Sequence, residues 1–272
     1  MNAGTAPDPR PRSCYGPALF WPLAVWSLLP LGLLAIVAFS GGWRFPSLLG
    51  AAPGTPPWAG IPGSWWRLGD ALVASAGLAL AVGGLSAAGG MWVGRSVAGL
   101  RGPWRALGAA ALFLPVAVPP LTLGVGLQYS LLRVGLGGSM AGVLLSHLVP
   151  ALGYTGLFFL GIFMAYDAEI EEEARRLGAS RSAVWLRVTL PLLRRPLAEA
   201  CVLGFLISWA QVPLTLIVGQ GRVRTLTVEV LAWMQGGQDP LAAAGALALS
   251  LPPIALMLVV ALAVRRAEAV IA

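Results

Sequence analysis

The chain has 272 residues, of which 57% are hydrophobic and 11% are charged, and its mean hydropathy is +0.79. This composition is too apolar for a soluble domain and predicts an all-α membrane protein with about six transmembrane helices. The 18 basic residues are all arginine and the net charge is +7. Because these arginines lie between apolar runs rather than in a basic patch, we expect no nucleic-acid partner.

The first 69 residues are predicted to form a lead, one transmembrane helix and a loop. Residues 1–17 are polar and rich in proline, which indicates a cytoplasmic N-terminal lead. Residues 18–40 are long and apolar enough to cross a bilayer, whereas a signal peptide, the alternative, has an apolar region of about 7–15 residues. We therefore predict an uncleaved transmembrane helix. Residues 41–69 are dense in proline, glycine and tryptophan, which predicts a periplasmic loop without helix at the membrane interface.

Residues 70–264 are predicted to form a core of five transmembrane helices. The expected helices cover residues 70–95, 106–132, 140–166, 196–218 and 241–264. The first of these five is rich in small residues, which let neighbouring backbones approach closely and indicate a central position. The second contains Pro115, Pro119 and Pro120, which predict either a break that lines a pathway or a packing kink. We expect a polar loop at residues 219–240 and a cytoplasmic tail at residues 265–272.

Residues 167–196 form the only strongly charged segment. From Asp167 to Glu199 the chain has six acidic residues and six arginines. Burying twelve charges at a bilayer centre would cost roughly 30 kcal/mol or more, so the segment must lie in water. With six transmembrane helices, thirteen arginines fall on the side of both termini and five on the other. The positive-inside rule then predicts that both termini and the charged segment are cytoplasmic.

Several kinds of chemistry are missing from the sequence. Without lysine there is no GxxxxGK[ST] phosphate-binding loop, so the chain is not expected to bind ATP in that way. No acidic residue lies deep within a predicted transmembrane helix, which disfavours a proton-coupled carrier. The single histidine, His147, cannot form a zinc site alone, and an intramembrane hydrolase would need it beside a serine such as Ser139 or Ser146. We expect no catalytic residue, cofactor or metal.

Within the charged segment, residues 168–177 are predicted to form a short helix. Acidic residues fill its first turns, arginines close it, and Gly178 follows as the usual glycine stop. Ser180 can cap a second helix, of about residues 181–188, which a Leu-Pro pair would end. Physical chemistry alone leaves two interpretations of this helix-turn-helix, a docking element or an amphipathic connector that rests on lipid headgroups.

The spacing within this segment resembles the EAA loop of ABC-importer permeases. That loop has the pattern E-A-A, three residues, G, nine residues, I, one residue, L-P. The residues that carry the resemblance are Glu172, Glu173, Ala174, Gly178, Val188, Leu190 and Pro191. The spacing matches throughout, and two positions depart, with Glu173 in place of alanine and Val188 in place of isoleucine. Residues 70–264 also resemble the five-helix core of type I permeases, with the first helix an addition.

The resemblance implies the membrane permease subunit of a binding-protein-dependent ABC importer, in a bacterial inner membrane. It implies that the EAA-like residues couple the permease to separate ABC ATPase subunits, where ATP is hydrolysed. The other implied partners are a second permease subunit, identical or related, an extracytoplasmic substrate-binding protein and membrane lipid. Residues 208–230 are most similar to permeases of the iron(III), thiamine and polyamine branch.

Two alternatives stay open at this point, an ATP-independent channel or secondary carrier and an intramembrane hydrolase. The residues that are candidates for lining a pathway are Gln128, Tyr129, Gln211 and Thr215. Each of these polar side chains could instead form a hydrogen bond between neighbouring helices.

Overall fold

The computed structural model describes residues 16–39 and 63–271, and all regular structure in these ranges is helical. The helices are α1 (Gly16–Phe39), α2 (Ser64–Gly99), α3 (Pro103–Ala117), α4 (Pro120–Arg133), α5 (Met140–Met164), α6 (Glu169–Arg176), α7 (Arg181–Val184), the π-helical segment η2 (Trp185–Thr189), α8 (Leu190–Trp209), α9 (Pro213–Gly219), α10 (Leu226–Gln235) and α11 (Asp239–Ile271). Most of the predicted lead and most of the predicted periplasmic loop lie outside the described ranges.

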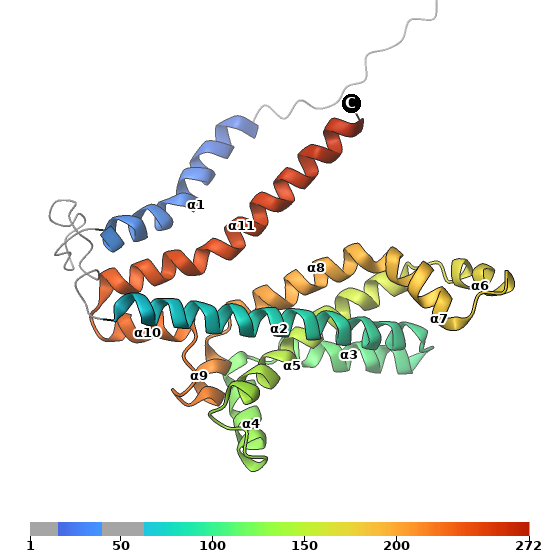
Figure 1. Cartoon of the computed structure of the whole chain (residues 1–272), viewed down its shortest axis with the longest axis horizontal. Helices are drawn as coiled ribbons and strands as arrows, with labels where there is room; N and C mark the ends of the chain where they lie inside the picture. The colour runs from blue at the N-terminus through green and yellow to red at the C-terminus, as the bar shows by residue number, and fades with distance from the viewer. Residues whose placement is uncertain (1–15, 40–62, 272) are drawn as a thin grey trace, which may run out of the picture.

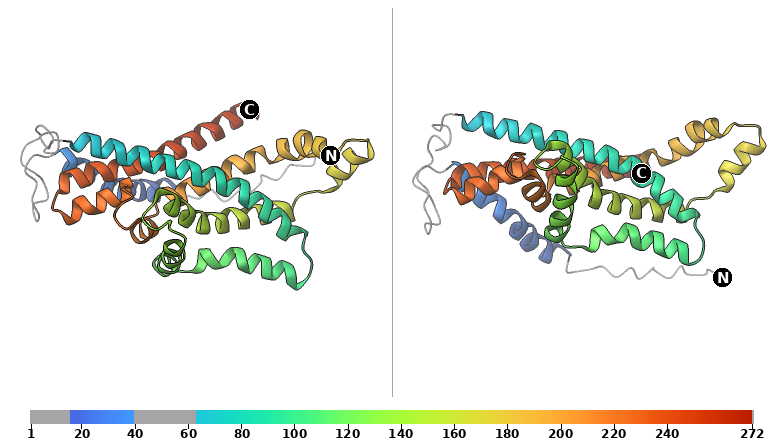
Figure 2. Two further views of the ribbon diagram at one scale, coloured as in Figure 1. Left: turned by 60° about the horizontal axis from the view of Figure 1, so that its bottom comes forward. Right: turned by 90° about the horizontal axis from the view of Figure 1, so that it is seen from below.

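Helices α2, α3, α5 and α8 run side by side along the long axis of the molecule (Figure 1). α6 and α7 lie at one end of this bundle, and α10 lies at the other end beside the start of α2. α1 pairs with α11 on one side, and α4 packs against α9 on another (Figures 1 and 2). The predicted charged segment therefore projects from one tip of the molecule.

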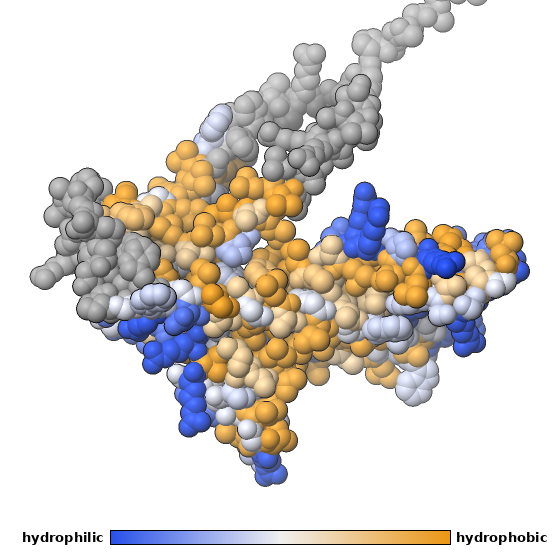
Figure 3. All heavy atoms as spheres, in the orientation of Figure 1, coloured by the Kyte–Doolittle hydropathy of each residue, from blue (hydrophilic) through white to orange (hydrophobic). Residues whose placement is uncertain are grey.

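Four helical segments in the described part of the chain are long and apolar enough to cross a membrane. They are Trp21–Phe39, Trp66–Gly99, Met140–Met164 and Asp239–Leu256. Two bent helix pairs are also apolar enough, which gives up to six spans. In Figure 3 the hydrophobic surface (orange) lies between hydrophilic groups (blue) at the α6–α7 tip and near α9 and α10. The all-α architecture with about six transmembrane helices is confirmed.

Small residues on α2 let α5 and α8 pack directly against its backbone. A methyl group added to Gly83 would lie 2.6 Å from the carbonyl oxygen of Cys201 on α8. One added to Gly94 would lie 2.8 Å from the carbonyl oxygen of Gly156 on α5. The predicted central position of this helix is confirmed, because both neighbours approach it more closely than a side chain would allow.

The span predicted at residues 106–132 is instead two helices, α3 and α4, that meet at an angle of 100°. The break falls at Val118, whose backbone is extended (φ −71°, ψ 130°), and at Pro119. A proline disfavours the helical conformation of the residue before it, and two successive prolines extend that effect over two residues. The proline-rich stretch is thus a full break rather than a kink.

The span predicted at residues 196–218 starts earlier and is also bent. α8 begins at Leu190, directly after η2, and α9 follows it at an angle of 63°. Leu190 and Pro191 therefore do not end the second helix of the charged segment. In η2 the N–H of Leu190 donates to the carbonyl of Trp185, a π-type bond. Pro191 comes directly after this π-type turn, inside the continuous run of α7, η2 and α8, so its missing N–H falls where the α-type hydrogen-bond pattern is already interrupted.

Other predicted boundaries also shift. Residues 64–69, predicted as loop, already belong to α2, and α11 continues past 264 to Ile271. Residues 219–240, predicted as a polar loop, contain α10. Leu226, Val230 and Trp233 recur at helical spacing and are buried in one cluster with residues of α2 and α11. This apolar face explains why a segment that is polar on average forms a helix.

Candidate functional site

The first helix of the charged segment ends as its residue order predicts. Gly178 follows α6 with φ +89°, a left-handed conformation that glycine adopts without strain. Its N–H donates to the carbonyl of Arg175, and the N–H of Ala179 donates to the carbonyl of Ala174. These two bonds form a Schellman motif, which satisfies the last carbonyls of the helix. The predicted helix and its glycine stop are confirmed.

The second helix of the segment begins with the predicted cap. The side chain of Ser180 accepts a hydrogen bond from the N–H of Ala183 at 3.2 Å. α7 and η2 together then run without interruption into α8. The turn after α6 thus lies between two capped helix ends.

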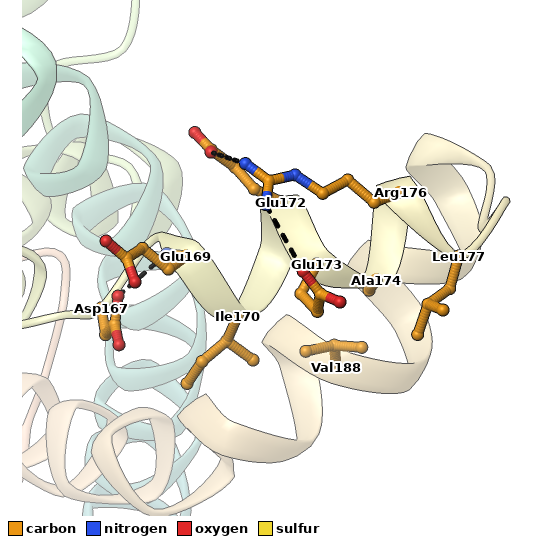
Figure 4. Close-up of a pocket in the computed structure, with 9 residues that line it drawn as sticks. All are labelled: Asp167, Glu169, Ile170, Glu172, Glu173, Ala174, Arg176, Leu177 and Val188. Carbon is orange, nitrogen blue, oxygen red and sulfur yellow. Dashed lines mark hydrogen bonds and ion pairs between the residues drawn. The ribbon is translucent and has the colours of Figure 1, made fainter.

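A hollow of about 690 Å³ lies against α6 and η2 (Figure 4). Its lining residues are Asp167, Glu169, Ile170, Glu172, Glu173, Ala174, Arg176, Leu177 and Val188. Ile170, Leu177 and Val188 supply apolar surface, and Leu177 is 82% exposed. Glu172 and Glu173 flank them and pair with Arg176 at 4.0 and 3.7 Å. An exposed apolar patch with a charged rim is the form of a protein-docking surface.

The structure brings most of the EAA-like residues together at this hollow. Four of them line it, namely Glu172, Glu173, Ala174 and Val188. Gly178 shapes the turn at the end of α6. Leu190 and Pro191 do not line the hollow, and they form the first turn of α8. Their position connects the segment directly to a predicted span.

Glu171, which is not one of the EAA-like residues, is the buried acid of α6. It is 6% exposed. Its Oε2 accepts a hydrogen bond from Nη2 of Arg95 on α2 at 2.8 Å, and its Oε1 accepts one from Oγ1 of Thr189 in η2 at 2.9 Å. Burial acts to raise the pKa of Glu171, but these two hydrogen bonds and the charge of Arg95 outweigh it. The pKa of Glu171 is therefore held below its ordinary value.

Tyr166 lies beside this ion pair, in a second hollow with Arg95 and Glu171. Burial, followed by the negative charge of Glu171, raises the pKa of the Tyr166 hydroxyl, which therefore stays neutral at physiological pH. The sequence held a signal for Glu171. Three successive glutamates cover about 200° of a helix, so they cannot all lie on one narrow outward face. Nothing in the sequence set Arg95 apart, because it is one of thirteen arginines that the positive-inside rule places on the cytoplasmic side.

The candidate pathway residues lie around the two breaks. Gln128 and Tyr129 are on α4, Gln211 is at the break before α9, and Thr215 is on α9, which packs against α4. Tyr129 is 60% exposed, whereas Thr215 is 1% exposed. Nε2 of His147 bonds Oγ1 of Thr215 at 2.9 Å. Thr215 thus joins two helices rather than facing an open pathway in this conformation.

His147 does not meet the serines that a hydrolase would require. Ser146 donates to the carbonyl of Val143, and Ser139 caps α5. Nδ1 of His147 instead lies 2.9 Å from Oγ of Ser208 on α8. Both side chains are buried, with exposures of 1% and 5%, so no substrate can reach them in this conformation. The geometry does not favour the hydrolase alternative.

Comparison with known proteins gives the same fold and the same class. Residues 88–269 match the family described as binding-protein-dependent transport system inner membrane component. The chain also resembles a crystal structure of a bacterial ABC transporter involved in the import of the acidic polysaccharide alginate. The TM-score is 0.64 and the identity 14%, over 94% of this chain and 98% of that chain. At this identity the likeness establishes the fold alone.

Three curated relatives are informative. The chain is 35% identical over 152 residues to the inner membrane ABC transporter permease protein YnjC of Escherichia coli K12. The matched region covers 56% of this chain and 30% of YnjC. It is 34% identical over 169 residues to the molybdenum transport system permease protein ModB of Mycobacterium tuberculosis, which covers 57% and 63%. It is 24% identical over 211 residues to the spermidine/putrescine transport system permease protein PotC of E. coli K12, which covers 75% and 79%.

The matches to YnjC and ModB thus span less than two thirds of those relatives. The family match, by contrast, takes in two thirds of this chain and includes α5, the charged segment, α8, α9 and α10. This chain therefore belongs to the family of binding-protein-dependent transport system inner membrane components.

Proposed function

We propose that this chain is the permease subunit of an ABC importer and that its α6 segment docks a separate ABC ATPase. The observation that carries the docking role is the hollow beside α6, where four EAA-like residues and the exposed Leu177 form an apolar patch with an acidic rim. Permease subunits of this kind are generally not enzymes. In the proposal ATP is hydrolysed by the partner, since this chain has no lysine for a phosphate-binding loop.

The remaining partners follow from the same proposal. An extracytoplasmic binding protein delivers the cargo, and a second permease subunit, identical or related, completes the pathway between two copies of the core. The broken helices α3–α4 and α8–α9 support this arrangement, because irregular backbone at membrane depth is tolerated where it is buried in protein or lines a cavity. In this proposal Gln128, Tyr129 and Gln211 line the pathway in at least one of its conformations.

The proposal places the protein in a bacterial inner membrane with both termini and α6 in the cytoplasm. The excess of arginine on that side supports this orientation. The names of the relatives specify different cargoes, molybdenum and spermidine/putrescine. We assign the choice of cargo to the binding protein. The polyamine relative supports placement near the iron(III), thiamine and polyamine branch.

Co-purification with the ATPase subunit tests the docking role. Glu172→Arg reverses the charge of the rim, and Gly178→Pro forces φ to about −65° at a residue that needs +89°. We expect both variants to reach the membrane in normal amounts and to lose the ATPase during purification.

Matched variants separate docking from general damage. Glu172→Gln keeps the shape of the rim, and Gly178→Asn keeps a residue that tolerates left-handed backbone, so both should retain most of the ATPase. If Glu172→Arg and Gly178→Pro bind the ATPase as well as the unmodified protein, α6 is not the docking element.

A further inference from the structure

The buried acid of α6 joins this helix to α2 and to η2. Glu171 does not line the docking hollow, unlike its neighbours Glu172 and Glu173. Its two carboxylate oxygens are used separately, one by Arg95 on α2 and the other by Thr189 in η2. α6 therefore presents one acidic face outward and anchors itself to the bundle through the remaining glutamate.

The arginine of this group is fixed by aromatic rings as well as by the carboxylate. The guanidinium of Arg95 lies 5.4 Å from the ring centre of Phe163 on α5 and 5.3 Å from that of Trp185 in η2. Trp185 in turn stacks on Trp92 of α2 at 4.8 Å. The planar guanidinium fits between such rings better than a lysine ammonium would, so its position is set before α6 contributes.

The π-helical segment brings the third partner into place. Trp185 and Thr189 are the first and last residues of η2. The ring of Trp185 contacts the guanidinium of Arg95, and the hydroxyl of Thr189 donates to Glu171. Thr189 is fully buried. π-type turns within α-helices are frequent at functional sites. Since η2 continues directly into α8, an attachment of α6 to Thr189 is also an attachment to α8.

Through Arg95, Glu171 also attaches α6 to α2, the central helix of the bundle. α2 packs backbone to backbone on α5 and α8 at Gly83 and Gly94. Close-packed interiors of this kind transmit strain from one helix to the next. The opposite end of α2 carries a comparable ion pair, between Arg67 and Glu229 of α10 at 3.1 Å, with Glu229 5% exposed. Each end of α2 is thus paired with one buried glutamate.

We propose that Glu171, Arg95 and Thr189 form a clasp that makes α6 move as one body with α2 and α8. A displacement of α6 is then passed to the centre of the membrane bundle instead of being absorbed by the turns beside it. Glu171 and Thr189 act here as positioning residues, because neither lines the docking hollow. The consequence for transport rests on the proposed ATPase docking, whereas the clasp itself can be measured without an ATPase.

A distance measurement between α6 and α2 tests the clasp. Spin labels are placed by Arg175→Cys on α6, which does not line the docking hollow, and Leu80→Cys on α2, both exposed positions. Cys14 and Cys201 are replaced by serine. The full-length protein is measured in lipid nanodiscs by double electron–electron resonance. We expect a single narrow distance that does not change when the ATPase and a non-hydrolysable ATP analogue are added.

Loss of the clasp should loosen α6 alone. Glu171→Ala and Thr189→Val should each lose the single narrow distance, and the mean distance should shift when the ATPase binds. Thr189→Val keeps the shape of the side chain and removes only the hydroxyl, so it remains informative if Glu171→Ala does not fold. Thr189→Ser keeps the hydroxyl and should retain the narrow distance.

Two outcomes would overturn the proposal. One is a narrow, unshifted distance in both Glu171→Ala and Thr189→Val. The other is equal broadening in Glu229→Ala, which removes the buried glutamate at the opposite end of α2, because the effect would then be a general loosening of the bundle. If no ATPase co-purifies with the unmodified chain, the docking role fails, while the distance in the free permease still reports on the clasp.

Discussion

His147, the only histidine of the chain, joins α5 to both halves of a bent helix pair. Its ring bonds Ser208 on α8 and Thr215 on α9, on either side of the 63° bend. Thr215 also donates its one hydroxyl proton to the carbonyl of Gln211. The hydroxyl must therefore accept from the ring, which places the ring proton on Nε2 and makes Nδ1 the acceptor for Ser208. Every polar atom of this group is then satisfied without water.

Replacing His147 should destabilise the bend. His147→Ala leaves a buried cavity and removes the ring that bonds both Ser208 and Thr215, and we expect a loss of about 2–4 kcal/mol of unfolding free energy. Thermal unfolding in detergent, followed by the intrinsic tryptophan signal, measures the change. Ser208→Ala removes only one of the two bonds and should lose a smaller part. An unchanged midpoint in His147→Ala would show that packing of α9 on α4 holds the bend instead.

At the scale of the elements, α2 shows how small residues determine which helices become neighbours. Gly83 and Gly84 are adjacent in sequence but face different surroundings. A methyl group on Gly83 would meet the backbone of α8, whereas one on Gly84 would have no neighbour within 4 Å. Helical geometry turns successive residues by about 100°, so only one of the two can face α8.

This adjacent pair provides a prediction with its own control. Gly83→Ala should destabilise the protein by about 1–3 kcal/mol, because the methyl group forces α2 and α8 apart. Gly84→Ala should be neutral or stabilising by up to about 1 kcal/mol, since alanine favours the helix more than glycine. Unfolding midpoints of the two variants, measured side by side, decide the matter. Equal effects at both positions would contradict the close approach of α8.

Elements differ in how well the sequence predicted them. Long apolar runs predicted α1, α2, α5 and α11, because transfer into lipid depends on summed hydropathy. α10 was missed because it is short and the polar residues of segment 219–240 outweigh its apolar face when the segment is judged by its average polarity. The break between α3 and α4 was one of two alternatives that the prolines predicted, whereas the bend between α8 and α9 was missed. A proline marks where a helix can break, but the angle depends on which neighbour the second half packs against, here α4 on α9.

At the scale of the whole molecule, the proposed orientation can be checked with reporter fusions. Alkaline phosphatase is active only outside the cytoplasm, and green fluorescent protein exported in the unfolded form does not fluoresce. We expect a fluorescent protein after Ala272 to fluoresce and a phosphatase there to be inactive. A phosphatase fused after Gly138, in the α4–α5 turn, should be active because that turn lies on the opposite side. Active phosphatase at the C-terminus would reverse the orientation and remove α6 from the cytoplasm.

Sequence alone determined the class of protein, the approximate number of spans and the position of the charged segment. These follow from quantities that accumulate residue by residue, namely hydropathy, charge and the spacing of the EAA-like motif from Glu172 to Pro191. Only the tertiary structure decided that Glu171 turns inward to Arg95, 76 residues away, and that His147 finds Ser208 and Thr215, 61 and 68 residues away. Such pairings depend on where packing places whole helices, and no local pattern in the chain encodes that placement.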